Sequence, residues 1–268
     1  MFIIPVRFDL TTGVGSTAFI PHPITIDEAY GLDWVNMTKP TVPAGYEGLT
    51  LVCRKGDYTL CTLYDDTGYL AGSQIAVSIV ALNKYYHFLT DFKKRRRFSI
   101  RLYFFLCLFA DYSKTKATRL AARKSDCLLQ DTNIYVDDFG GELRSISTTA
   151  SNIESSSNYT EQGCMVGMGR HYYYKMTKTS TCEVDTLSRW FPLTYADQVV
   201  GIGFNFPGKY TVPEGYLNPF ETPPRAAIQL IVPNGPECMY AYGDTGMVTM
   251  HTYFIKDAYF ILCQFNLG

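Results

Sequence analysis

The chain has 268 residues, a net charge of −1 and only 18% charged residues. Its length allows one large β domain or two small ones with a sizeable core, and its 8 Cys are too few for a disulfide-dense mini-scaffold. Abundant aromatic residues (Tyr 21, Phe 17) favour strands over exposed helices.

The N-terminal region gives conflicting indications about the compartment. Met1–Arg7 has neither a basic n-region nor a sustained apolar run, so this start is not a signal peptide, and taken literally it predicts a cytoplasmic protein. The even number of Cys and the glycosylation sequons at Asn36 and Asn158 favour an oxidising compartment instead. We expect an extracellular glycoprotein whose true start is missing from this sequence.

Paired strands are predicted between residues 50 and 80. Leu51–Cys53 and Thr59–Leu63 flank the turn Arg54–Asp57, a pattern typical of a β-hairpin. Cys53 and Cys61 lie symmetrically about this turn. The hairpin therefore gives a local reason to expect a Cys53–Cys61 disulfide.

Half of the positive charge lies in one segment. Lys84–Lys124 contains 12 Lys or Arg and 2 Asp, a local balance of +10. Lys93–Arg97 precedes the apolar run Phe98–Ala110, which as a helix spans about 20 Å, short of the roughly 30 Å hydrocarbon core, so no membrane span is predicted. The basic run is typical of nucleic-acid patches. Because no recognition helix or stacking platform accompanies it, we expect no nucleic-acid partner.

Two interpretations of this segment remain open. It is either a solvated basic loop beside an amphipathic helix, or translated non-coding sequence that is foreign to the natural protein. Under the second interpretation Cys107 and Cys127 do not belong to the disulfide set.

The composition changes along the chain and predicts four segments. Residues 1–82 are expected to form N-terminal β-hairpins, 83–130 a basic and apolar insertion, 131–160 a polar loop, and 161–268 a C-terminal β region that packs on 1–82. The predicted fold class is mainly β, with antiparallel sandwich or barrel-like hairpins and a short helical or irregular insertion.

Two histidines lie among methionine and aromatic residues. His171 and His251 are candidate metal ligands, because imidazole suits zinc or copper, and Met168 and Met250 are candidate thioether ligands, which suit Cu(I). In a strand, however, His251 and Thr249 share one face and Met250 lies on the other. Met250 and His251 could then bind one ion only if a bulge intervened.

The sequence around these histidines resembles a family of uncharacterised, secreted animal proteins. The resemblance rests on the Cys-x-x-Gly-Met-Gly-x-His-Tyr-x-Tyr run Cys164–Tyr174 and the Met-His-x-Tyr-Phe run Met250–Phe254. Further matching pieces follow in the expected order: Cys182, Phe191-Pro192, Gly201–Phe204, Glu221–Pro224, Cys238 and Cys263. The match covers about residues 161–263, and more loosely residues 46–78. It implies secretion and disulfides but brings no established chemistry.

Six cysteines are expected in disulfides. They are Cys53, Cys61, Cys164, Cys182, Cys238 and Cys263. Six cysteines allow fifteen connectivities, and only Cys53–Cys61 has a local argument.

Two functional hypotheses remain. The chain lacks Gly-x-Ser-x-Gly, Cys-x-x-Cys and His-Glu-x-x-His motifs, so no catalytic residue is predicted. The first hypothesis is a secreted, non-catalytic protein with a binding or structural role, an unknown extracellular ligand and histidines packed in its core. The alternative is a copper- or zinc-binding metalloprotein, with oxidoreductase activity as one use of the metal. That alternative requires ligating nitrogens of His171 and His251 within about 4 Å of each other.

Overall fold

The structure, a computed structural model, describes residues 3–7, 19–37, 47–78, 95–96, 101–109, 114–122, 132–137, 143–183, 186–210, 212, 214–216 and 218–263. The chain forms two compact units. Unit 1 comprises Met1–Ile4, Pro21–Thr148 and Tyr210–Pro219, and unit 2 comprises Pro5–Ile20, Thr149–Lys209 and Phe220–Gly268.

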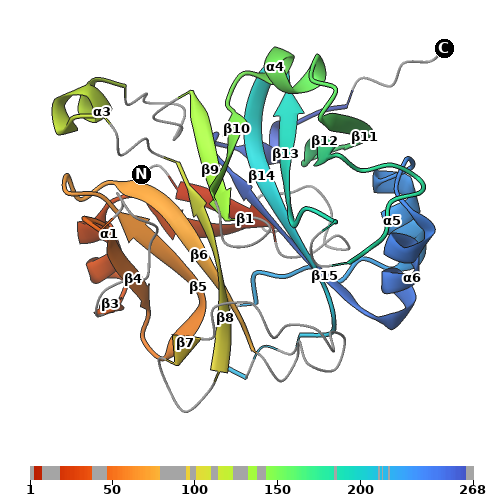
Figure 1. The fold of residues 1–268 in the computed structure, drawn as a ribbon. Coiled ribbons are helices and arrows are strands. Elements are labelled where there is room, and N and C mark those ends of the chain that lie inside the picture. Colours follow the sequence, from red (N-terminus) through yellow and green to blue (C-terminus); the bar gives the residue numbers. More distant parts are fainter. Residues whose placement is uncertain are drawn as a thin grey trace. The chain divides into compact units, whose positions relative to one another are not determined.

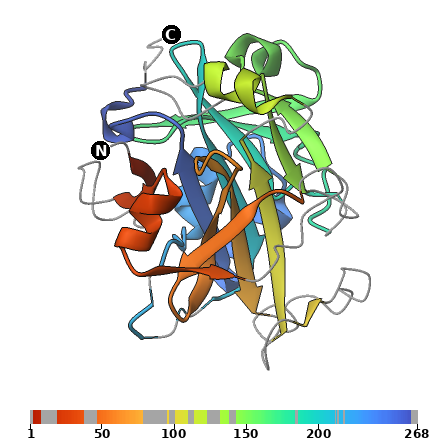
Figure 2. The ribbon, with the colours of Figure 1, turned by 90° about the vertical axis from the view of Figure 1, so that its left-hand side faces the viewer.

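Unit 1 contains an antiparallel sheet with the strand order β10-β9-β8-β6-β5-β4-β3, in which β7 also pairs with β8. Its strands are β3 (Trp34–Met37), β4 (Thr50–Arg54), β5 (Asp57–Tyr64), β6 (Leu70–Ser78), β7 (Arg95–Arg96), β8 (Arg101–Leu108), β9 (Asn133–Asp137) and β10 (Leu143–Ser147). Among the described residues of this unit, the helices are α1 (Ile26–Gly31) and α3 (Lys116–Ala122). The strands β4 to β6, in orange, and β8, in yellow, can be followed in Figure 2.

Unit 2 is built on a second antiparallel sheet with the order β11-β12-β13-β14-β15, which β1 and β2 continue. Its strands within unit 2 are β11 (Tyr159–Met165), β12 (Gly169–Tyr174), β13 (Trp190–Tyr195), β14 (Gln198–Pro207) and β15 (Met247–Tyr253). The residues of β1 (Ile3–Arg7) and β2 (Phe19–Pro23) are divided between the two units, and His22 on β2 belongs to unit 1. The helical segments are α4 (Ala150–Glu154), α5 (Arg225–Ile231), α6 (Glu237–Thr245) and the short η3 (Ala258–Phe260). Helices α5 and α6 lie side by side (Figure 1) and contribute Ile228, Ile231 and Met239 to the apolar core of this unit.

Three disulfides join the six cysteines named from the sequence. Cys53 and Cys61 lie directly opposite each other on β4 and β5 and are bonded. The other two bonds, Cys164–Cys263 and Cys182–Cys238, lie within unit 2. They close loops of 99 and 56 residues, which constrains the unfolded chain more than a short loop does. Cys107 is buried and outside these bonds, and Cys127 lies outside the described residues.

The mainly β fold class is confirmed by these two antiparallel sheets with few short helices. Of the two interpretations of the basic and apolar segment, the amphipathic helix is wrong for residues 101–108, because they form the strand β8. This strand lies between β6 and β9 and pairs with β6 from Gly72–Leu108 to Ser78–Leu102. Backbone partners on both sides therefore favour the extended form over an isolated helix.

The segment 131–160 also differs from the polar loop expected from its composition. It contains β9, β10 and α4, because Ile146, Ala150 and Ile153 are buried among the polar residues and anchor it. The other predicted segment boundaries stay predictions. In the described part of the chain, no helix combines the length and the apolar character needed to cross a membrane.

Candidate functional site

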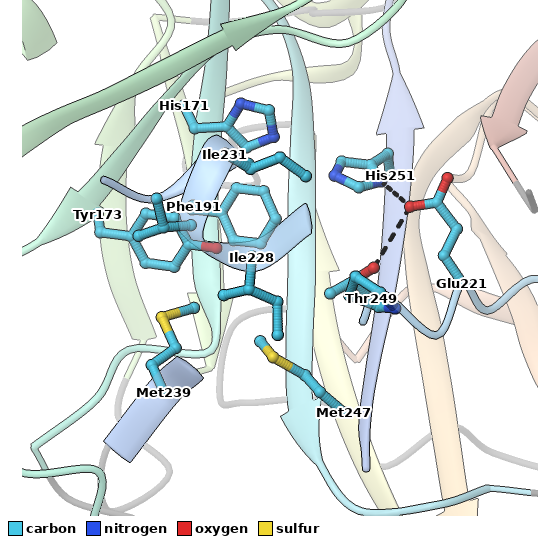
Figure 3. Close-up of a pocket in the computed structure, with 12 residues that line it drawn as sticks. His171, Tyr173, Phe191, Glu221, Ile228, Ile231, Met239, Met247, Thr249 and His251 are labelled. Carbon is cyan, nitrogen blue, oxygen red and sulfur yellow. Dashed lines mark hydrogen bonds and ion pairs between the residues drawn. The ribbon is translucent and has the colours of Figure 1, made fainter. Parts of the chain in front are cut away.

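A small pocket in unit 2 lies between its sheet and the helices α5 and α6 (Figure 3). Its lining residues are His171, Tyr173, Phe191, Glu221, Pro223, Ile228, Ile231, Val232, Met239, Met247, Thr249 and His251. The cavity volume is about 20 Å³, enough for one water-sized guest. Pockets for drug-sized ligands have about 300–1,000 Å³. The pocket therefore suits a single small guest inside an apolar wall.

His171 lies on β12 opposite an irregularity in β11. The β11–β12 register shifts between Glu161 and Cys164, so β11 carries one extra residue at this point. Such a bulge takes a backbone group out of the ladder. Here the Gly163 carbonyl lies 3.1 Å from His171 Nδ1, and because a carbonyl only accepts, Nδ1 is the donor. The neutral ring then has its lone pair on Nε2.

The bulge is held in place by the end of α5 and the loop that follows it. The Asn234 backbone N–H donates to Gln162 Oε1 at 2.9 Å, and the Asn234 side chain donates to the Glu161 carbonyl at 3.1 Å. Gly163 is required for this close approach, since a Cβ there would lie 2.8 Å from the Leu230 carbonyl oxygen. The acceptor of His171 is therefore fixed by tertiary structure.

His251 lies on β15 beside a buried carboxylate. Glu221 and Thr249 exchange both backbone hydrogen bonds, at 2.8 and 2.9 Å, which brings the Glu221 side chain alongside β15. Glu221 Oε2 lies 3.1 Å from His251 Nδ1 and accepts a hydrogen bond from Thr249 Oγ1 at 3.3 Å. A carboxylate beside Nδ1 favours the tautomer that carries its proton there. Nε2 is then the basic nitrogen of His251.

Phe191 supports both imidazoles. Its ring stacks on His171 at a centroid distance of 5.5 Å and meets His251 edge-on at 5.6 Å. It also stacks on Tyr173 at 4.7 Å. Gly203 lies opposite Phe191 and His251 on the neighbouring strands, and a Cβ at Gly203 would overlap the Phe191 ring. The glycine thus leaves the space that this aromatic wall occupies.

The two imidazoles face each other. Their ring centroids are 5.7 Å apart and their planes are at 85°. In Figure 3 a nitrogen of each ring points towards the other ring, while the second nitrogen of His251 faces Glu221. His171 is 1% and His251 3% exposed. An ion about 2 Å from one nitrogen of each ring holds the two centroids about 6 Å apart when the two bonds are in line and closer when they are bent, so the observed separation admits an ion with bent bonds.

The predicted thioether ligands lie elsewhere. Neither Met168 nor Met250 lines the pocket, and Met250 occupies the alternate position on β15 from His251. Met239 and Met247 do line it, but Figure 3 shows them at the end away from the imidazoles, beyond Ile228 and Phe191. The structure thus brings His171 and His251 together without these methionines between them.

Within the described ranges, no group of three or more His, Cys, Asp or Glu side chains is arranged to hold a metal ion. The third described histidine, His22, belongs to unit 1 and packs edge-on against Trp34 at 5.5 Å. The two sequon residues, Asn36 on β3 and Asn158 before β11, are both exposed.

Two residues of the site were not identified from the sequence. Glu221 was noted only as part of the Glu-Thr-Pro-Pro stretch, and Gly163 received no role. The nearest signal is the pair Pro223-Pro224, which keeps Thr222 and the chain up to the start of α5 extended, directly after the residue that pairs with Thr249. No pattern in the sequence marks the Gly163 bulge.

A scan against protein-family models gives no match to this chain, and searches of curated proteins and of solved structures find no similar protein.

Proposed function

We propose that this chain is an extracellular, disulfide-linked protein with a non-catalytic binding role, and that unit 2 binds one metal ion between His171 and His251. The observation that carries the proposal is that each imidazole has an oxygen 3.1 Å from Nδ1, the Gly163 carbonyl for His171 and Glu221 Oε2 for His251. Metal-ligating histidines almost always have such a partner at the other nitrogen, which fixes the tautomer and the ring orientation. Both Nε2 atoms are thereby prepared as ligands.

The burial of the site favours binding over catalysis. Catalytic metal sites keep an open position for water or substrate, whereas structural and storage sites are closed. His171, His251 and Glu221 are each at most 3% exposed, and apolar side chains of α5 and α6 line the same pocket. An ion held there would be shielded from substrates.

The extracellular location is supported by covalent features. Three disulfides are characteristic of oxidising compartments. The exposed Asn36 and Asn158 leave both sequons accessible to glycosylation, and the resemblance to secreted proteins points the same way. We predict that protein recovered from the medium of a secretory host carries glycans on both Asn residues. Mass spectrometry before and after enzymatic deglycosylation measures this, and unmodified sequons on protein from the medium would contradict it.

Metal content tests the binding proposal. Protein purified without chelator from medium containing copper and zinc should carry close to one equivalent of one of these ions, measured by inductively coupled plasma mass spectrometry. The variants His171→Gln and His251→Gln should each lose it, because either change removes one of two ligands. His22→Gln makes the same chemical change at a buried imidazole of unit 1 and should retain the ion.

Folding is checked separately by near-ultraviolet circular dichroism and by the absence of free thiols beyond Cys107 and Cys127. If a Gln variant does not fold, the metal content of the wild-type protein still tests the proposal. A folded wild type without metal, even after titration with zinc and copper salts, would contradict the proposal. The histidines would then be packed core residues of a protein that binds something else.

A further inference from the structure

We infer that the ion held between His171 and His251 is Cu(I), bound by the two imidazole nitrogens alone. This inference rests on the proposed function, since it chooses among the ions that the pair could bind. Three properties of the site carry it: the number of ligands, the charge of its surroundings and the arrangement of the two rings.

The number of ligands separates copper from zinc. Structural zinc sites are almost always four-coordinate with protein ligands. Across the described residues no cluster of three or more suitable side chains exists, and Glu221 is already in contact with His251 Nδ1 and Thr249. Cu(I) is a soft, closed-shell ion that is stable with as few as two nitrogen ligands. Two facing imidazoles therefore satisfy Cu(I) and leave zinc under-coordinated.

The charge of the site also favours a monovalent ion. The Born cost of burial grows with the square of the charge, so a divalent ion costs roughly four times as much to bury as a monovalent one. The nearest anionic group of the site is Glu221, whose side chain is 1% exposed. The remaining wall is made largely of the side chains of Phe191, Ile228, Ile231 and Val232. One carboxylate and two neutral imidazoles balance a single positive charge.

The arrangement of the rings leaves room for one ion between them. At a centroid separation of 5.7 Å with a nitrogen of each ring directed at the other, one ion can lie between the two Nε2 atoms. Phe191 contacts both rings and holds their spacing. Met239 and Met247 line the distant end of the pocket, so they are not ligands here. We expect copper with nitrogen neighbours and no sulfur neighbour.

Competition with a chromophoric Cu(I) chelator under anaerobic, ascorbate-reduced conditions tests the inference. The intact protein should withdraw one equivalent of Cu(I), and His171→Gln and His251→Gln should abolish this. Glu221→Gln should keep the ligands but weaken Cu(I) binding by about 10–100-fold, because the orienting carboxylate is lost. Met250→Leu, which lies outside the pocket, is a volume-matched control that should leave Cu(I) affinity unchanged.

X-ray absorption at the copper edge should give two nitrogen neighbours at about 2 Å. Sulfur neighbours, or a loss of Cu(I) in Met250→Leu, would overturn the two-imidazole site. One equivalent of Zn²⁺ bound through both histidines, with no stoichiometric Cu(I), would overturn the inference while the proposed function stands. If the folded wild-type protein binds neither Cu(I) nor Zn²⁺, both the Cu(I) inference and the proposed metal-binding function are wrong.

Discussion

Two regions of this molecule bury imidazoles in different ways. His22 in unit 1 is 3% exposed and packs edge-on against Trp34, and neither of its ring nitrogens has a hydrogen-bond partner among the described residues. Burial, and then the positive charge of Arg54, lower its pKa from 6.5 to about 4. His171 and His251 in unit 2 are buried as deeply, but each has an oxygen 3.1 Å from Nδ1.

The difference shows what burial alone does to a histidine. At His22 burial leaves a neutral aromatic side chain that contributes packing, as Phe or Leu would. At His171 and His251 the acceptors determine which nitrogen carries the proton and how the ring is turned. Metal-ligating histidines almost always have such a partner at the second nitrogen, so the oxygens beside Nδ1 are what separates His171 and His251 from His22.

The largest predicted effect comes from filling the space beside the pair. Gly203→Ala introduces a methyl group where the Phe191 ring lies, and Phe191 cannot move aside because His171, Tyr173 and His251 surround it. We expect a loss of about 3 kcal/mol in the free energy of unfolding, at the upper end for overpacking, together with loss of the ion that we propose between His171 and His251. Urea denaturation and metal content measure the two effects.

Gly31→Ala is the matched control in unit 1. A Cβ at Gly31, in the last turn of α1, meets no atom within 4 Å, and its φ is not positive. Its stability should change by less than about 1 kcal/mol, towards a more stable protein, because Ala restricts the unfolded chain. Equal effects of the two substitutions would show that the wall around the pair is not tightly packed.

The pH dependence of the free energy of unfolding tests the account of His22. Because its folded-state pKa of about 4 lies below 6.5, the unfolded chain binds the proton first as the pH falls. Stability that is fully present above pH 6.5 is therefore lost between pH 6.5 and 4. We predict that His22→Leu gains about 2 kcal/mol relative to wild type between pH 7.5 and pH 5, measured by urea denaturation. Parallel pH profiles for the two proteins would contradict the account of His22.

The smallest predicted effect concerns the support of Glu221. Thr249→Val removes the hydroxyl that donates to Glu221 Oε2 and should lower the free energy of unfolding by about 1 kcal/mol. Thr249→Ser keeps the donor and should recover most of that stability. If the Val and Ser variants were equally stable, the hydrogen bond would contribute nothing to holding the carboxylate.

Local patterns in the sequence predicted much of the fold. The hairpin of β4 and β5 and its cross-strand pair Cys53–Cys61 follow from apolar runs around a short turn. The alternation of side chains along a strand predicted that Met250 and His251 lie on opposite faces of β15, and only His251 lines the pocket. Conversely, the apolar run that forms β8 looked helical, because its backbone partners β6 and β9 are distant in the sequence.

The candidate site was predictable only in part. The sequence marked His171 and His251 by their Met-rich and aromatic surroundings, but not that they approach each other across β13 and β14. Glu221 lies 30 residues before His251 and reaches it through a single backbone bridge. The Gly163 carbonyl becomes available only because β11 is bulged. Such contacts depend on register and tertiary packing, which residue patterns do not determine.

The central claim is that His171 and His251 form one ion site, and anomalous diffraction tests it most directly. Crystals of the protein loaded with Cu(I) and measured on both sides of the copper edge should give one strong difference peak between the two Nε2 atoms. That peak should be absent from His171→Gln crystals, while the His22→Gln protein should retain it. Copper located elsewhere, or no peak between the imidazoles in fully loaded crystals, would contradict the account and leave both histidines as packed core residues like His22.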